Sequence, residues 1–230
     1  MQSPVSKHLL PFSASVLVTI SGCSSFTNTV GTSTSMGEPV PPGCSKVSKT
    51  LEESWDLAVQ RAKGAYTKHS KHITKKDRVA VINYVIPNDR EDRLRLYDPS
   101  EEWKLVESHW VSHAFNSDVA YEPGLEELYT DGCATQFSNV SQSLTSSKGA
   151  MITANAKAPS EWGREKLQVH GKDKKLNGNV FARTIVFHQA LDKQGEPATF
   201  SHGCFMLKPE DLDQVFDQIV GGALVYVHHE

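Results

Sequence analysis

The chain has 230 residues, of which 38% are hydrophobic, and a formal net charge of −3 at pH 7. This length suffices for one sizeable domain with shorter additional segments. Lysines and arginines are interspersed with acidic residues, so no basic stripe indicates nucleic-acid binding. No uninterrupted apolar run is long enough to span a bilayer as a helix.

Residues 1–22 have the three-part layout of a secretory signal peptide. A short polar start is followed by a mostly apolar stretch over residues 9–20 and by small residues before Cys23. The ending Ile20-Ser21-Gly22-Cys23 resembles a bacterial lipobox. That resemblance implies lipidation of Cys23, and Ser24 behind it implies an outer-membrane lipoprotein facing the periplasm. Ordinary cleavage, which would give a soluble periplasmic protein, is the alternative.

Export bears on the three cysteines beyond Cys23. Disulfides persist in an oxidising envelope, and a pairing of Cys44 with Cys133 would leave Cys204 as the free thiol that a nucleophile requires. The distance between Cys44 and Cys133 cannot be read from the sequence, so this pairing is a hypothesis. No Cys/His spacing indicates a zinc site, and no pattern points to a cofactor.

The segment before the main domain has two parts. Residues 23–50 are expected to form a flexible tether, because most of them are Ser, Thr, Gly, Pro and other residues with little to bury. Residues 51–76 are expected to form a helix and a loop. Apolar residues recur at helical spacing in the first part, and Thr50 and Glu53 form a capping-box pattern. The basic, polar run from Lys68 to Lys76 is expected to be a solvated loop.

Residues 77–230 have the pattern of a β-rich domain. Turn-forming residues such as Asn88-Asp89 and Asp98-Pro99 separate the apolar segments. A short amphipathic helix is expected between Pro209 and the pair Gly221-Gly222. Strands are expected at residues 79–86, 93–97, 105–113, 149–154, 166–170, 182–188 and 223–228. The fold class is therefore mainly β, with a minor α+β character and one or two packed helices.

Several short motifs follow one another in a recognisable order. They are Val81-Ile82-Asn83-Tyr84, Arg93-Leu94, Val111-Ser112-His113, Phe137-Ser138-Asn139, Ser146-Ser147-Lys148-Gly149, Leu176-Asn177-Gly178-Asn179, the stretch 182–188, and Ser201-His202-Gly203-Cys204. As an ordered set they resemble the L,D-transpeptidase (YkuD-like) catalytic domain family, in particular its second, envelope-associated branch. The resemblance covers roughly residues 78–230. It implies a YkuD-like β-sandwich, a cysteine nucleophile and peptidoglycan stem peptides as substrate.

Carried over residue by residue, the resemblance assigns Cys204 as the nucleophile and His188 as the base. Ser201 and Gly203 match the motif positions before the cysteine. A free thiol is only slightly ionised at neutral pH, so His188, at the end of a strand, would take the Cys204 proton. The backbone N–H groups of His202, Gly203 and Cys204 would form the oxyanion hole.

The attacked group would be the amide that joins the L-centre of diaminopimelate to D-alanine, and the product would be a thioester acyl-enzyme. An amine acceptor would give a cross-link or attachment of a protein lysine, and water would give carboxypeptidase activity. Two alternatives stay open: a thiol hydrolase of stem peptides or murein–protein links, and a non-catalytic peptidoglycan-binding lipoprotein. Gln189 and Phe205 depart from the commonest family pattern. His113 and His170 are rival bases, farther from the cysteine motif.

Other polar residues are candidates for substrate binding. Arg183 is expected to hold a stem-peptide carboxylate, because a guanidinium group suits bidentate recognition of carboxylates; a structural salt bridge is the alternative. Ser138, Asn139 and Ser146 are expected to line the cleft, with a role in loop turns as the alternative.

Overall fold

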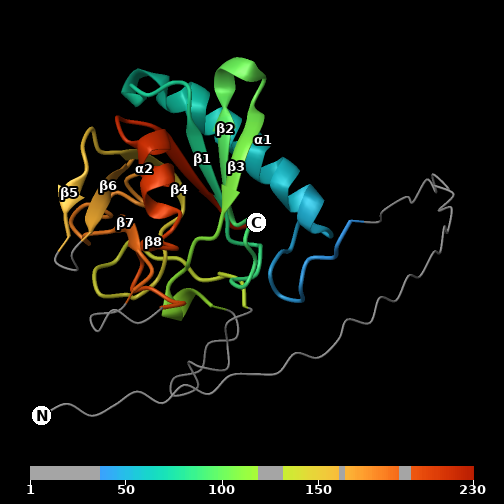
Figure 1. The fold of residues 1–230 in the computed structure, drawn as a ribbon. Helices are drawn as coiled ribbons and strands as arrows, with labels where there is room; N and C mark the ends of the chain where they lie inside the picture. Colours follow the sequence, from blue (N-terminus) through green and yellow to red (C-terminus); the bar gives the residue numbers. More distant parts are fainter. Residues whose placement is uncertain (1–36, 119–131, 161–163, 192–197) are drawn as a thin grey trace, which may run out of the picture. The chain divides into compact units, whose positions relative to one another are not determined.

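The computed structural model describes residues 37–118, 132–160, 164–191 and 198–230 (Figure 1). The expected signal peptide, Cys23 and the first part of the expected tether lie outside these described residues. Within the described part, no helix combines the length and the apolar character needed to cross a membrane.

Strands dominate the described part, together with two α-helices and three short 3-10 turns. In chain order the elements are α1 (Leu51–His69), η1 (Ser70–His72), β1 (Val79–Asn83), β2 (Leu94–Asp98), η2 (Pro99–Glu101), β3 (Lys104–His109), η3 (Phe115–Ser117), β4 (Gly149–Thr153), β5 (Ala158–Pro159), β6 (Glu165–Gly171), β7 (Val186–Gln189), β8 (Phe205–Leu207), α2 (Leu212–Ile219) and β9 (Leu224–His228).

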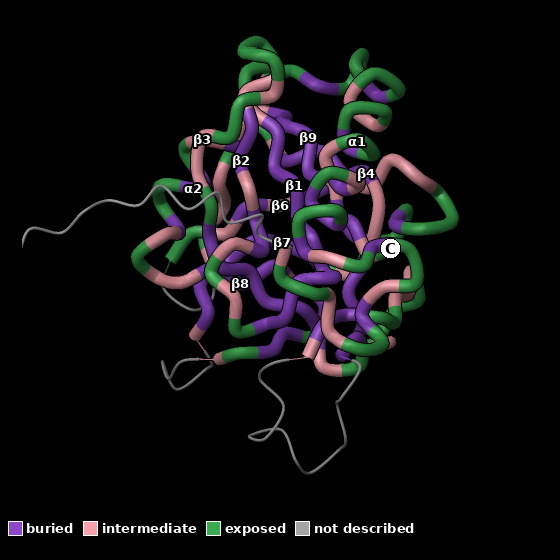
Figure 2. The backbone as a smooth tube through the Cα atoms, turned by 90° about the vertical axis from the view of Figure 1, so that its right-hand side faces the viewer, coloured by how far each residue is buried: buried purple, intermediate pink, exposed green. Residues whose placement is uncertain are grey.

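One sheet connects the described strands in the order β3-β2-β1-β9-β4-β6-β7-β8, with β5 paired on β6. At its centre β1 and β9 run parallel, with Val79 opposite Leu224, and their outer neighbours are antiparallel. All residues of β1 are buried, which is the pattern of a strand covered on both faces. Figure 2 shows β1 and β9 within the buried part of the backbone.

The two faces of β1 belong to two different cores. Val79 and Val81 pack in a cluster with side chains of α1, whereas Ala80 and Ile82 pack in a cluster with side chains of α2. Because successive side chains of a strand point to opposite faces, the two helices cover opposite faces of the sheet. Strands β6, β7 and β8 add side chains to the α2 cluster, so the sheet curls around α2 as a half-barrel. The expected mainly β fold with packed helices is confirmed.

Helix α1 begins where the sequence predicts. The Thr50 hydroxyl accepts the Glu53 N–H at 3.1 Å, and the Glu53 carboxylate accepts the Thr50 N–H at 3.3 Å, which confirms the capping box. The helix continues to His69, so the prediction that a loop begins at Lys68 was wrong. Basic residues favour the carboxyl end of a helix, and His69 is also buried there.

Some predicted strands were too long, and the two short strands β5 and β8 were missed. β1 ends at Asn83 because the Asn83 side chain accepts the Val85 N–H at 3.1 Å and starts a turn. β7 begins only at Val186, since the chain before it forms turns and Thr184 has a φ of 56°. β8 has only three residues, and its partner β7 lies far away in the sequence, so no local pattern announces it.

The expected disulfide is present. Cys44 and Cys133 are joined, with Cα atoms 5.7 Å apart. The bond ties the segment before α1 to the segment that follows residue 131. Cys204 is the free cysteine among the described residues.

Candidate active site

Cys204 lies one residue before β8, which pairs in parallel with β7. The register sets Phe187 beside Phe205 and His188 beside Met206. The Phe187 and Phe205 rings pack in the core with their centroids 4.7 Å apart. Because side chains alternate along a strand, His188 and Met206 face the other side of this strand pair. Cys204 precedes β8, and the same alternation, continued by one residue, would set it on the side of His188.

A tight loop precedes Cys204. The Ser201 hydroxyl donates to the Cys204 carbonyl at 2.7 Å and accepts the Gly203 N–H at 3.1 Å. Gly203 has a φ of 124°, and a Cβ there would lie 2.8 Å from Ile185 Cδ1 and 3.0 Å from the Thr145 carbonyl oxygen. Only glycine meets both constraints. The Gly203 N–H, one of the three expected oxyanion donors, is directed at Ser201 in this structure.

The Cys204 thiol is protonated at neutral pH. Burial raises its pKa above the ordinary value of 9.0, and the Val186 N–H and the nearby cations Arg183 and Lys166 oppose the rise. Sγ lies 3.7 Å from the carbonyl oxygen of Thr184. A carbonyl oxygen can only accept a hydrogen bond, so this contact requires a protonated thiol as the donor. A nucleophilic role for this cysteine therefore requires a base.

His188 has the protonation state of such a base. Burial lowers its pKa from 6.5, although the hydrogen bond to the Gln189 carbonyl works against that. Nδ1 lies 2.7 Å from this carbonyl oxygen. A carbonyl only accepts, so Nδ1 carries the proton and Nε2 is the basic nitrogen. A neutral imidazole with a basic Nε2 suits proton abstraction from a thiol.

Arg183 lies beside the nucleophile loop. Its guanidinium donates to the Ser147 hydroxyl at 2.9 Å and to the Thr145 carbonyl at 2.7 Å. The expected alternative, a structural salt bridge, is not found among the described residues. Arg183 and the exposed His202 line a pocket of about 350 Å³. A cation that has no ion pair within the described part of the chain, at the wall of this pocket, suits an incoming carboxylate.

Comparison with known proteins decides the family. The sequence profile of the L,D-transpeptidase catalytic domain family (YkuD_2) matches residues 48–228. The chain belongs to this family. Among curated proteins no relative matches this L,D-transpeptidase-family chain.

Two similar solved structures are also L,D-transpeptidases by their titles. One, from Mycobacterium smegmatis, has 14% sequence identity and a TM-score of 0.34, over 66% of this chain and 58% of that one. The other, a Yku protein from Stackebrandtia nassauensis, has 17% identity and a TM-score of 0.36, over 75% of this chain and 64% of that one. The match thus spans less than two thirds of the length of each.

The two other histidines considered as bases in this L,D-transpeptidase domain, His113 and His170, make contacts away from Cys204. His113 is fully buried, with Nδ1 2.8 Å from an Arg93 nitrogen and Nε2 2.8 Å from an Asp118 carboxylate oxygen. Arginine only donates, so Nδ1 accepts and the Nε2–H donates to the carboxylate. Burial lowers the His113 pKa to about 4. His170 is exposed and stacks on Phe181, with centroids 5.0 Å apart. Neither imidazole is arranged as a base for Cys204.

The polar residues expected to line the cleft form a framework around Arg183. Ser146 is fully buried, and its hydroxyl accepts the Ala114 N–H at 3.0 Å. The Ser138 carbonyl accepts from Arg183 at 2.5 Å. The Asn139 side chain accepts the N–H of Asn179 at 2.8 Å. These contacts favour the loop-turn alternative for all three residues. The Ser138 carbonyl holds Arg183, Asn139 holds the loop before it, and Ser146 holds the segment at Ala114.

Residues 112–115 fasten the nucleophile loop at both ends, a role that the sequence did not reveal. Ser112 N–H donates to the Met206 carbonyl, and its hydroxyl accepts the Met206 N–H, both at 3.1 Å. On the other side, Ser201 N–H donates to the His113 carbonyl at 3.0 Å, and Phe115 N–H donates to the Ser201 carbonyl at 3.1 Å. The motif Val111-Ser112-His113 was the available signal.

Proposed function

We propose that this domain is an L,D-transpeptidase that acts on peptidoglycan stem peptides through a Cys204 thioester. The observation that carries the proposal is the free thiol of Cys204 directly before β8, the strand that pairs with the His188 strand β7. The closed Cys44–Cys133 disulfide leaves this thiol as the reactive sulfur of the described part. Family membership supports the transpeptidase reaction class.

In the first half-reaction, His188 Nε2 takes the thiol proton while Sγ attacks the amide carbonyl at the L-centre of diaminopimelate. The negative charge on the carbonyl oxygen is assigned to the remaining expected donors, the His202 and Cys204 N–H groups. The C–N bond then breaks, the leaving amine takes the proton from His188, and D-alanine departs. A thioester on Cys204 remains.

In the second half-reaction, an amine acceptor attacks the thioester carbonyl. His188 removes a proton from the attacking amine, the C–S bond breaks, and the sulfur is reprotonated. An acceptor from another stem peptide yields a cross-link, and a protein lysine yields an attached protein. Water in place of the amine yields L,D-carboxypeptidase activity. Arg183 would orient the donor by pairing with one of its carboxylates.

Incubation with tetrapeptide muropeptides tests the proposal. Wild type should release D-alanine and carry a thioester-linked adduct detectable by mass spectrometry, whereas Cys204→Ala should do neither. His188→Gln should lose at least a hundredfold in rate, because the thiol is then left without its base. His170→Gln is the matched control and should keep wild-type activity.

The acceptor is decided in the same assay. Added D-amino acid or diaminopimelate should appear in the product if the domain is a transferase. Release of D-alanine without incorporation would indicate the hydrolase instead. Identical products from wild type and Cys204→Ala, with sacculus binding retained, would leave only the non-catalytic binder.

We also propose that the chain is exported and lipidated on Cys23, and that the domain faces the periplasm from the outer membrane. The support is the layout of residues 1–22 followed by the lipobox-like sequence. The disulfide agrees with an oxidising compartment.

A further inference from the structure

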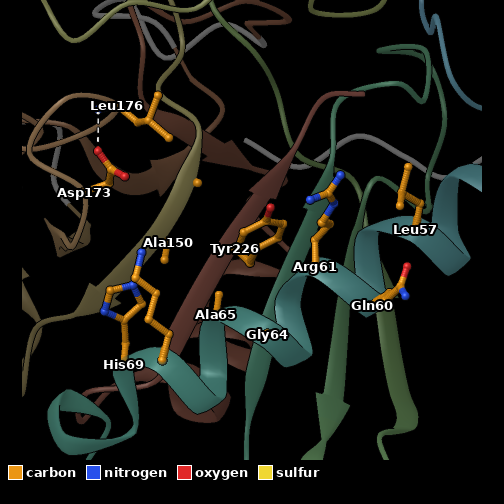
Figure 3. Close-up of a pocket in the computed structure, with 12 residues that line it drawn as sticks. Leu57, Gln60, Arg61, Gly64, Ala65, His69, Ala150, Asp173, Leu176 and Tyr226 are labelled. Atoms are coloured by element: carbon orange, nitrogen blue, oxygen red, sulfur yellow. Dashed lines mark hydrogen bonds between the residues drawn. The ribbon is translucent and has the colours of Figure 1, made fainter.

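A second cavity lies between α1 and the strands β4 and β9, and Figure 3 shows its lining. Its volume is about 630 Å³, within the range of ligand sites. It shares no lining residue with the pocket beside Arg183. Leu57 to His69 of α1 form one wall, and Ala150, Tyr226 and the loop after β6 complete it. No step of the proposed reaction uses this cavity.

The shape of the cavity suits an extended chain. The lining stretch of α1, from Leu57 to His69, is about 18 Å long at 1.5 Å per residue. A peptide of about five residues in extended form covers that distance. Apolar side chains such as Ala65 and Leu176 lie between the polar ones. The backbone and the aliphatic parts of the side chains of a bound peptide would therefore pack against this wall.

Positive charge collects at one end of the cavity. Lys68 lines it, and Lys172 lies close enough to act on His69 electrostatically. Burial first, and then these cations, lower the pKa of His69, so its ring is neutral at pH 7. Neither Lys68 nor Lys172 makes an ion pair among the described residues. Asp173 is the acid in the lining, and its Oδ1 already accepts the N–H groups of the two residues at 175 and 176, at 2.9 and 3.1 Å.

Arg61 adds a cation along the same helix. Its nitrogen lies 3.4 Å from a carboxylate oxygen of Glu230, and both side chains are about half exposed. An exposed pair of this kind is worth at most about 1 kcal/mol. A ligand carboxylate in the cavity could therefore replace Glu230 as the partner of Arg61 at little cost.

His69 supplies a hydrogen-bonding group at the wall. Its side chain is only 9% exposed, and its ring has no hydrogen-bond partner among the described residues. Its ring nitrogens are accessible to water, and a hydrogen-bonding group of a ligand would replace that water. Figure 3 shows His69 at the end of the cavity where Asp173 and Ala150 also lie.

Gly64 keeps the middle of this wall open. It lies inside α1, and a Cβ built there would meet no atom within 4 Å. Glycine in a helix interior costs about 1 kcal/mol relative to alanine, so its presence opposes helix stability. The missing side chain leaves room in the cavity that any larger residue would fill.

We propose that this cavity binds an acidic peptide of about four to five residues in extended form, with its carboxylates at Arg61, Lys68 and His69. The peptide we assign to the cavity is a second stem peptide, distinct from the one that acylates Cys204. This assignment rests on the proposed function. The domain would then hold two stems at once, one in each site.

The test is an NMR titration of Cys204→Ala protein with synthetic L-alanyl-γ-D-glutamyl-diaminopimelyl-D-alanine. The amides of Gly64 and Ala150 should shift. Gly64→Leu, which fills the cavity with a better helix former, and Lys68→Glu should each weaken this binding at least tenfold. Lys46→Glu is the matched control, since Lys46 is exposed and does not line the cavity; it should bind as tightly as the parent. Thermal unfolding of Gly64→Leu should show an unchanged or higher Tm.

Other results overturn the inference in distinguishable ways. Shifts confined to Arg183 and His202 would remove the second site and leave the proposed function intact. Equal weakening by Lys46→Glu would reduce the effect to general charge attraction. If inorganic phosphate shifts the Gly64 amide resonance and the tetrapeptide does not, the cavity binds a phosphate ligand instead. If no amide resonance shifts, the cavity is not a stem-peptide site. The proposed function is then tested independently by the turnover of muropeptides by the wild-type protein.

Discussion

Cys204 and His188 are both neutral at pH 7, because burial raises the thiol pKa and lowers the imidazole pKa. The resting pair is therefore thiol and imidazole, and proton transfer accompanies attack on the substrate. The two departures from the family pattern have structural roles here. Phe205 is a fully buried core residue against Phe187, and the Gln189 carbonyl fixes the tautomer of His188.

This protonation state predicts how Cys204 reacts with iodoacetamide. Without substrate the alkylation rate should rise with pH around a midpoint above 9.0, since only the thiolate reacts and burial opposes its formation. Mass-spectrometric counting of Cys204 adducts over pH 5–10 measures the midpoint. A rate plateau already reached below pH 7 would indicate a thiolate–imidazolium pair and contradict the prediction.

Gly203 predicts a second residue-scale effect. In Gly203→Ala the new Cβ would clash with Ile185 and with the Thr145 carbonyl at a φ of 124°. We expect at least a tenfold loss of muropeptide turnover and a loss of about 1–3 kcal/mol in the free energy of unfolding. Gly64→Ala is the control for stability alone, because its Cβ has open space; it should raise stability by about 1 kcal/mol. Full activity of Gly203→Ala would show that the loop tolerates another backbone conformation.

At the scale of elements, the short strand β8 is held from two sides. β7 supplies the ladder, and residues 112–115 fasten the chain at Ser201 and Met206. Behind that segment lies the buried row Arg93–His113–Asp118, in which a neutral imidazole separates the two charges. The position of the nucleophile therefore depends on a network that does not touch the thiol.

This network predicts a pH-dependent stability. The folded pKa of His113 is about 4, below the ordinary 6.5, so the unfolded state binds the proton first. Stability is complete above pH 6.5 and declines as pH falls towards 4; the difference of about 2.5 pH units corresponds to about 3 kcal/mol. Urea unfolding of wild type and His113→Gln at pH 7, 5.5 and 4 measures it.

His113→Gln should be less stable at pH 7 and show the shallower decline. Burial also lowers the pKa values of His228 and His229 to about 4. These two residues therefore contribute the same loss of stability at low pH to wild type and to His113→Gln. Parallel curves for the two proteins would mean that His113 does not titrate between the folded and unfolded states as stated.

At the scale of the whole molecule, the described part is a half-barrel with α1 docked on its outer face and with the Cys44–Cys133 bond beside it. The family profile begins at residue 48, so α1 belongs to the matched region. The segment before it connects the domain to the proposed lipid anchor.

The anchor itself is testable by mass. Expressed in a bacterial host with lipoprotein processing, the mature chain should begin at Cys23 and carry diacylglyceryl and N-acyl groups. Cys23→Ala should remove this mass and release the protein from membranes. A mature chain cleaved at Cys23 without added lipid would support the soluble periplasmic alternative.

Much of the fold was predictable because it is encoded in local patterns. The capping box at Thr50 and Glu53, the alternating strands and the stop at Gly221-Gly222 need only neighbouring residues. The ordered motifs gave the family and the candidate pair Cys204 and His188. The limits of β1 and β7 were predicted less well, because side-chain hydrogen bonds and positive φ angles end or delay those strands.

The sequence by itself determined the family, the mainly β class and which thiol and imidazole to consider. Only the tertiary structure decided that β8 is a strand, that His113 is locked between Arg93 and Asp118, and that Ser146 belongs to the framework. These features join residues distant in the chain through parallel pairing and buried hydrogen bonds. The local sequence does not indicate such contacts, because a polar residue gives the same sequence pattern whether its side chain binds a substrate or a buried group of the protein.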